Sequence, residues 1–259
     1  MCEGRFQCDC RGIGTDWKVD ELRQIASTLL GSVDMVADAD DLVADFTAMM
    51  DQAMTKDTND VELRLWAPQG ANVAFVRQVA PAIEDLTVRG RPSGPLTVDY
   101  PTGAWGDESR DYHVCIQVPP RAIGEEMAAG RVALVVDGEV VSQALIRAIW
   151  TDDRALSTRI SREVAHYTGQ TELMEAIQDG LSARKAGDEA GATVQLGRAV
   201  QLAAQSGNTT KLELLAAIVD VEDAATGTVR LKPRVADQDE MMLDTRSTKT
   251  MRVTPAGEP

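Results

Sequence analysis

The chain has 259 residues, a net charge of −15 and 44% hydrophobic residues, and this length predicts two or three compact units. Acidic residues outnumber basic ones by 41 to 26, which disfavours nucleic acids and anionic membranes, because both are bound through clustered Lys and Arg. No apolar run approaches the roughly 18–20 residues that span a bilayer, and no signal peptide or disulfide framework is evident. We therefore expect a cytoplasmic protein.

The first unit, residues 1–58, shows the order strand, turn, helix, strand, helix. A partly alternating strand at residues 5–14 runs into a glycine-rich turn, and apolar residues follow at helical spacing from Val19 to Leu30. Residues 32–37 predict a second strand. Residues 38–54 predict a second helix, with aspartates in its first turn where the helix dipole favours them. This order is typical of the closing part of an α/β sheet domain.

The second unit, residues 59–152, changes to a period of two. Short runs of alternating apolar and polar residues are separated by clusters of Gly, Pro and Asp. Asp137-Gly138 lies between two such runs and is a strong signal for a hairpin turn. Several short strands with regular turns predict an antiparallel β-sandwich.

The remaining chain returns to helical spacing in residues 153–222 and then becomes polar. Helices are predicted over residues 155–168, 170–187, 188–206 and 209–221. Part of this region resembles a tetratricopeptide-type hairpin, but a true array needs about three repeats of ~34 residues. A peptide-binding groove and a plain helical appendage therefore stay open as alternatives. The tail, residues 223–259, is predicted to be mostly disordered.

The first unit resembles the end of a von Willebrand factor A (VWA) domain. The resemblance rests on the turn Gly12-Ile13-Gly14-Thr15-Asp16, on Leu22 and Ile25-Ala26 in the next helix, and on Leu42 and Phe46 in the last one. The run from Tyr100 to Tyr112 resembles a signature of bacterial cytoplasmic proteins that carry such a domain. The resemblance implies an α+β multidomain protein with a partial, Rossmann-like α/β end, followed by the sandwich and the helices.

What the resemblance implies for function is a non-enzymatic scaffold or adaptor that binds other proteins. It also implies an association with Ser/Thr kinases and with phosphothreonine-binding forkhead-associated domains. The family's Mg²⁺ site requires an Asp-x-Ser-x-Ser loop, which this sequence lacks, and Asp16 lies in a later turn and does not transfer as a ligand. We therefore expect no cofactor here, and interpret the chain either as truncated or as completed by another chain. The alternative function is a Mg²⁺-dependent VWA ligand-binding protein whose metal site lies outside this chain.

Few residues of this sequence are candidates for catalysis or metal binding. Cys2, Cys8 and Cys10 could approach a metal ion, but zinc prefers four ligands and no fourth is evident nearby. His113 and His166 are isolated, without a nucleophile motif. Idle thiols and structural histidines are the simpler interpretation.

The loop at residues 105–113 is the remaining place for chemistry. Asp107 and its charged neighbours could form a paired-carboxylate site, so a hydrolase is the least favoured alternative. A loop held by Arg–carboxylate pairing is the simpler interpretation. Trp105 and Tyr112 could anchor a protein partner.

Three threonines of the tail, Thr245, Thr248 and Thr250, follow an acidic stretch. A phosphate on any of them would add about −1.5 to −2 charges and offer a group that arginines of a reader domain can bind. We predict them as candidate phosphorylation sites, with an ordinary polar tail as the alternative.

Overall fold

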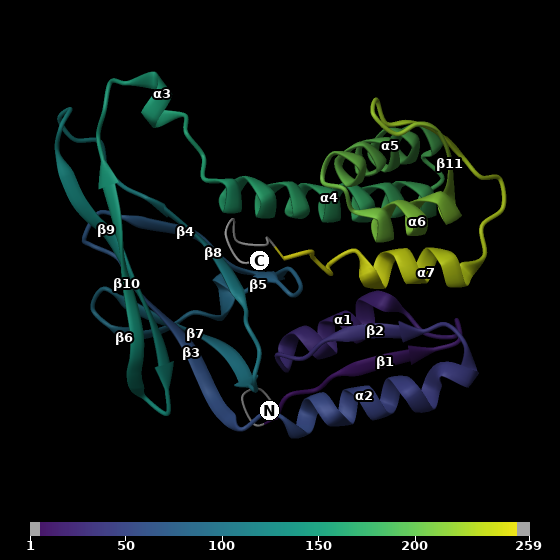
Figure 1. Ribbon diagram of the computed structural model, residues 1–259, viewed down its shortest axis with the longest axis horizontal. Coiled ribbons are helices and arrows are strands. Elements are labelled where there is room, and N and C mark those ends of the chain that lie inside the picture. The colour runs from purple at the N-terminus through teal and green to yellow at the C-terminus, as the bar shows by residue number, and fades with distance from the viewer. Residues whose placement is uncertain (1–5, 253–259) are drawn as a thin grey trace, which may run out of the picture.

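The computed structural model describes residues 6–252, which form three units lying side by side (Figure 1). A small α/β unit contains β1, β2, α1 and α2, a sandwich contains β3 to β10, and a helical unit contains α4 to α7 with β11 and β12. The strands are β1 (Cys10–Ile13), β2 (Val33–Val36), β3 (Thr58–Trp66), β4 (Asn72–Ala80), β5 (Glu84–Asp85), β6 (Arg91–Gly94), β7 (Thr97–Trp105), β8 (Asp111–Gln117), β9 (Glu126–Val136), β10 (Glu139–Ile149), β11 (Val219–Asp223) and β12 (Thr228–Leu231). The helices are α1 (Val19–Thr28), α2 (Leu42–Met54), α3 (Arg154–Ser157), α4 (Arg162–Lys185), α5 (Glu189–Gln205), α6 (Thr209–Ile218) and α7 (Asp237–Arg246), with the 3₁₀ turns η1 (Ala39–Asp41) and η2 (Thr87–Arg89).

The α/β unit has the predicted order of strand, helix, strand and helix. β1 and β2 pair in parallel, with Cys10 opposite Val33 and Ile13 opposite Val36. α1 crosses over between them and ends at Thr28, and Leu30, two residues later, has a positive φ of 57°. A parallel pair needs such a crossover, so the helix between the strands fixes their direction.

The sandwich consists of two antiparallel sheets with strand orders β10-β9-β3-β7-β6 and β5-β4-β8. Its core joins Leu63 and Leu65 of β3 to Val76 of β4, all of them buried. The hairpin between β9 and β10 turns at Asp137 and Gly138, which have φ values of 49° and 84°. The turn and the sandwich therefore agree with the prediction, because a two-residue hairpin of this kind needs positive φ at both positions.

The helical unit differs from the prediction at three places. The helix predicted over residues 209–221 ends at Ile218, because residues 219–221 belong to β11. The helix predicted over residues 155–168 is interrupted after α3, and α4 begins behind Ser161, whose hydroxyl accepts from the Val164 amide at 3.2 Å. α4 then continues through Gly169, where a break was predicted. A lone helical glycine costs about 1 kcal/mol, which the buried face of a 24-residue helix outweighs.

The prediction of a mostly disordered tail is wrong for residues 223–252. β11 and β12 form a hairpin and α7 follows, and Val229 and Leu243 belong to the same buried core as α4, α5 and α6. The runs of apolar residues in this segment are too short to show a period, but Val229 and Leu243 pack against the helices α4, α5 and α6. Residues 253–259 lie outside the described residues.

Within residues 6–252, no helix is both long and apolar enough to cross a membrane.

Candidate interaction surfaces

α2 carries an apolar stripe that the described chain does not bury. Val43, Phe46, Met50 and Met54 are 76%, 55%, 44% and 80% exposed, and α2 has no buried residue. Their spacing of three to four residues places them along one side of the helix. We call these four residues the α2 stripe. The predicted helix is present, but its large apolar side chains on this side stay exposed.

The strand edge beside this helix is also open. In residues 6–252 the small sheet contains only β1 and β2, and α7 runs along β2, where Arg246 binds Asp34 at 3.1 Å. α7 lies along β2, whereas the outer edge of β1 has no strand partner among these residues, and Ile13 at its end is 52% exposed. Parallel sheets are normally larger and covered on both faces. The open edge of β1 and the α2 stripe together form what we call the open face.

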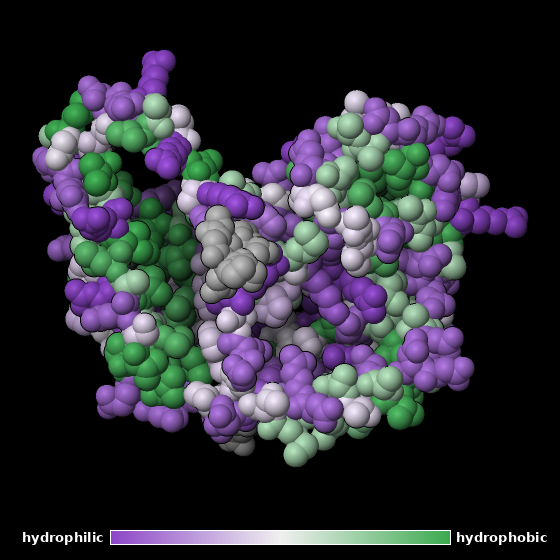
Figure 2. Space-filling model, in the orientation of Figure 1, coloured by the Kyte–Doolittle hydropathy of each residue, from purple (hydrophilic) through white to green (hydrophobic). Residues whose placement is uncertain are grey.

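A second apolar surface lies on the sandwich. Figure 2 shows apolar side chains gathered over β9 and β10. On β10, Val140, Val141, Leu145 and Ile149 are between 48% and 61% exposed. This strand is at the edge of its sheet, so among the described residues no strand pairs with the backbone groups on its outer side.

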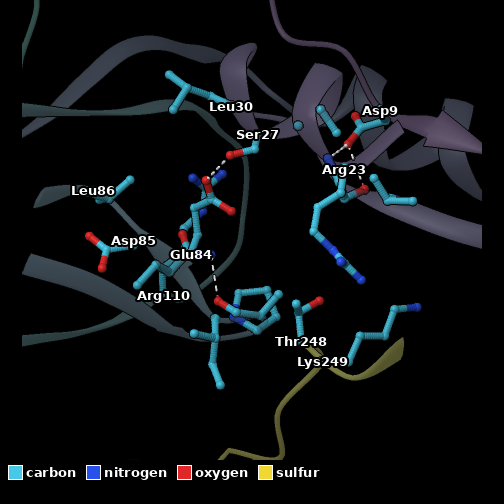
Figure 3. A pocket seen from close by; sticks show the side chains of 18 of the residues that line it. Asp9, Arg23, Ser27, Leu30, Glu84, Asp85, Leu86, Arg110, Thr248 and Lys249 are labelled. Atoms are coloured by element: carbon cyan, nitrogen blue, oxygen red, sulfur yellow. Dashed lines mark hydrogen bonds between the residues drawn. The ribbon is translucent and has the colours of Figure 1, made fainter. Parts of the chain in front are cut away.

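A cleft of about 470 Å³ lies where the three units meet (Figure 3). Several of its charged groups are paired: Glu84 accepts from Ser27 at 2.6 Å and from Arg89 at 2.6 Å, and Arg23 binds Asp244 at 2.7 Å. These contacts join α1 to the sandwich and to α7. The geometry indicates a polar joint that holds the units together.

The carboxyl end of α7 is held by cations from several elements. Lys211 of α6 is 4% exposed and donates to the backbone oxygen of Arg246, while Arg246 and Lys249 both contact Asp34. Burial, aided by the charges of Lys249 and Arg246, lowers the pKa of Lys211 to about 7. A lysine near the carboxyl end of a helix satisfies a carbonyl that lacks an intrahelical partner.

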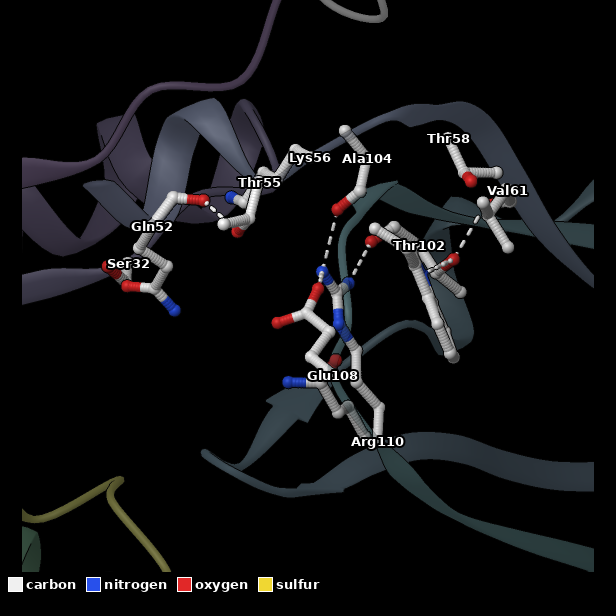
Figure 4. A network of polar contacts seen from close by, with 12 residues as sticks. Ser32, Gln52, Thr55, Lys56, Thr58, Val61, Thr102, Ala104, Glu108 and Arg110 are labelled. Atoms are coloured by element: carbon white, nitrogen blue, oxygen red, sulfur yellow. Dashed lines mark hydrogen bonds and ion pairs between the residues drawn. The ribbon is translucent and has the colours of Figure 1, made fainter. Parts of the chain in front are cut away.

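Trp105 and Tyr112 are half-buried and lie stacked, with ring centroids 6.4 Å apart. Arg110 packs over Trp105 and donates to the backbone oxygens of Thr102 and Ala104 at 2.5 and 2.8 Å (Figure 4). The same guanidinium binds Glu108 at 2.5 Å. The loop is thus held by an Arg–carboxylate pair, which was the simpler of the two sequence-based interpretations.

The histidines and cysteines serve separate contacts. His113 packs edge-to-face on Phe75, and burial, together with the charge of Arg77, lowers its pKa. His166 contacts the backbone oxygen of Met251 at 2.8 Å.

The Sγ atoms of Cys8 and Cys10 are 3.9 Å apart, and burial, followed by the bond from Cys8, raises the pKa of Cys10 to about 11. Cys2 lies outside the described residues. Across residues 6–252, no three His, Cys, Asp or Glu side chains gather to hold a metal ion, and Asp16 is exposed.

The three predicted phosphorylation sites lie on structured chain rather than on a free tail. Thr245 is 2% exposed in the last turn of α7. Thr248 and Thr250 are half-buried: the backbone oxygen of Thr248 accepts from the Ile83 amide at 2.8 Å, and the Thr250 hydroxyl donates to the Val79 oxygen at 2.6 Å. Whether any of them is phosphorylated stays a prediction.

The fold and these surfaces define a class of protein: an α+β chain in which the end of a parallel sheet is joined to a β-sandwich and a helical unit. A family model described as von Willebrand factor type A C-terminal domain matches residues 201–247. A solved structure, von Willebrand factor type A from Catenulispora acidiphila, is 49% identical and superposes with a TM-score of 0.93, covering 97% of this chain. The chain belongs to the von Willebrand factor type A proteins. It spans 60% of the length of that relative, and no curated protein matches it.

Proposed function

We propose that this chain is a non-enzymatic, scaffold-type part of a VWA protein and that it binds other protein segments through the open face. The carrying observation is the α2 stripe, because α2 has no buried residue although four large apolar side chains line one of its sides. Contiguous exposed apolar surface of this kind is typical of interaction sites. The open edge of β1 adds unpaired backbone groups beside it, which a further strand can pair.

The partner that fits this surface is an α/β segment that extends the parallel sheet. Such a segment would pair a strand with β1 and cover the α2 stripe with its own apolar side chains. The relative has length beyond the 60% that this chain matches, and that remainder is the natural probe. Under this proposal a Mg²⁺ site, if the assembly has one, is formed mainly by the partner segment.

The test is to purify this chain and the unmatched remainder of the Catenulispora protein separately and to measure their association by sedimentation velocity and calorimetry. We expect a one-to-one complex. A double substitution, Phe46→Lys with Met50→Lys, should abolish it. Val194→Lys is the matched control, because Val194 is a 69% exposed apolar residue on α5, away from the surface. No association of the unmodified chain, or equal binding by the double variant, would contradict the proposal.

The same mixture tests the Mg²⁺-dependent alternative. Titration of Mg²⁺ into this chain alone should give no specific heat, whereas a single saturable site in the complex would favour the metal-dependent ligand binder. Binding of Mg²⁺ to this chain alone would contradict the placement of the site on the partner.

We also propose the link to Ser/Thr kinases and forkhead-associated domains through the tail. Thr248 and Thr250 are the better candidates, because Thr245 is buried in α7. A kinase would have to act while residues 248–252 are detached from β4. Incubation with a Ser/Thr kinase, followed by mass spectrometry, should modify Thr250 more in Arg252→Ala than in the unmodified chain. Equal modification would argue against this dependence.

A further inference from the structure

The last described residues bind the sandwich in the manner of an added strand. Lys249 forms an antiparallel bridge with Ala82, and two backbone hydrogen bonds flank it: Ile83 donates to Thr248 at 2.8 Å and Thr250 donates to Pro81 at 3.0 Å. Main-chain pairing of this kind is how an extended peptide joins an exposed sheet edge.

Two side chains give this strand a sequence requirement. The Thr250 hydroxyl donates to the backbone oxygen of Val79 at 2.6 Å. Two residues later, Arg252 binds Asp111 through two hydrogen bonds of 3.0 and 3.1 Å. A paired guanidinium–carboxylate contact is specific in geometry as well as charge, so the pattern read here is Thr-x-Arg.

The receiving residues come from several elements that the rest of the fold positions. Asp111 begins β8 and also accepts from the Tyr167 hydroxyl of α4 at 2.5 Å. His166, next to Tyr167, contacts the oxygen of Met251 at 2.8 Å. The hydrogen bond from Arg252 lowers the pKa of Asp111, so its carboxylate is charged at neutral pH. Only the Tyr167 contact is independent of the strand, and it keeps Asp111 in place when residues 248–252 leave.

The occupying strand is weakly held compared with what precedes it. Arg252 is 50% exposed, and ion pairs at such exposure contribute little to stability. Leu243 in α7, by contrast, is 0% exposed. Local opening of residues 248–252 is thus expected well before α7 unfolds.

We propose that residues 79–83 and Asp111 form a strand-receiving site that binds an extended Thr-x-Arg segment of a partner protein, and that residues 248–252 occupy it as an internal competitor. A second copy of this chain is a poorer occupant, because its strand begins two residues after α7 and could reach across only if α7 left its core. The inference is independent of the open face.

The test uses full-length chain and a fluorescent peptide, Ser-Thr-Lys-Thr-Met-Arg, which copies residues 247–252. The double variant Thr250→Pro with Arg252→Ala removes an amide donor, a hydroxyl and the guanidinium from the internal strand while leaving the receiving residues intact. Fluorescence anisotropy should show the peptide binding this variant at least tenfold more tightly than the unmodified chain, because an internal competitor lowers apparent affinity. Arg252→Ala alone is a milder variant should the double one unfold.

Two controls separate recognition from attraction of a basic peptide to an acidic protein. A scrambled peptide of the same composition should not bind. Adding Asp111→Asn to the opened variant should remove binding of the correct peptide, with circular dichroism verifying the fold. Equal binding to the opened and unmodified chains, equal binding of the scrambled peptide, or binding that survives Asp111→Asn would each overturn the proposal. Concentration-dependent dimers of the opened variant would instead assign the site to a second copy and refute a partner-specific role.

Discussion

Replacing Leu243 by Ala should show that α7 is an integral part of the helical core. Leu243 is 0% exposed and packs within the cluster formed with α4, α5 and α6. The substitution removes three carbon atoms, which at about 0.8 kcal/mol each amounts to about 2.4 kcal/mol of lost burial. The cavity left behind raises the cost to about 3–5 kcal/mol. For a chain of this size each kcal/mol lowers Tm by about 2–4 °C, so we expect a fall of at least about 6 °C.

The assay is thermal and urea unfolding followed by circular dichroism at 222 nm. Val194→Ala on α5 is the matched control, because Val194 is 69% exposed and its truncation should change the free energy of unfolding by less than about 0.5 kcal/mol. A loss below about 1 kcal/mol for Leu243→Ala would refute the packing argument and restore the interpretation of residues 223–252 as a loosely attached tail.

Three further predictions concern the buried charges and the glycines of α4. Lys211 has a pKa of about 7 in the folded chain against 10.5 in the unfolded chain. Between these two values the unfolded state binds more protons, so the free energy of unfolding rises with pH. Lys211→Met should flatten this rise in urea titrations at pH 7 and pH 9. Arg64→Ala should destabilise the chain by about 2–3 kcal/mol, somewhat less than the loss of a fully buried pair. The reason is that Asp99, which is 5% exposed, would lose the guanidinium that binds it at 2.7 and 2.8 Å. A double-mutant cycle with Asp99→Asn measures the coupling. Gly180→Ala should cost about 1–3 kcal/mol, because its Cβ would lie 2.7 Å from a side chain of α5, whereas Gly169→Ala, facing open space, should stabilise by up to about 1 kcal/mol in the same unfolding assay.

The local sequence pattern was sufficient to predict the units whose strands and helices follow a simple hydrophobic period. The alternation in β3 and the Asp137-Gly138 turn predict a hairpin-rich sandwich, and the structure has both. The helix of the α/β unit was predicted for the same reason. Pattern failed at Gly169, because a residue's own preference is weaker than the buried contacts on either side of it.

The C-terminal segment was missed for a different physical reason. Val229 lies on a four-residue strand and Leu243 in a ten-residue, strongly acidic helix, and neither element buries enough surface to be stable alone. β12 and α7 are ordered because they pack against α5 and α6. Contacts between distant segments of this kind do not show in the local sequence pattern. Thr245 and Thr250 were consequently predicted on free chain, and the strand-receiving contact of Arg252 with Asp111 joins residues 141 positions apart, which no local pattern could reveal.

The α2 stripe shows a related limit of sequence reasoning, with a functional consequence. Phe46 and Met50 lie in the helix predicted over residues 38–54, in which apolar residues recur at helical spacing. A period, however, states only that one side of a helix is apolar; it does not state what covers that side. Here Leu42 and Met49 are half-buried, while Phe46 and Met50 remain exposed beside the open edge of β1. Exposed apolar area of this kind is costly in water and is usually retained only where a partner covers it. That is why the open face, rather than the polar cleft, is the surface on which binding should first be sought.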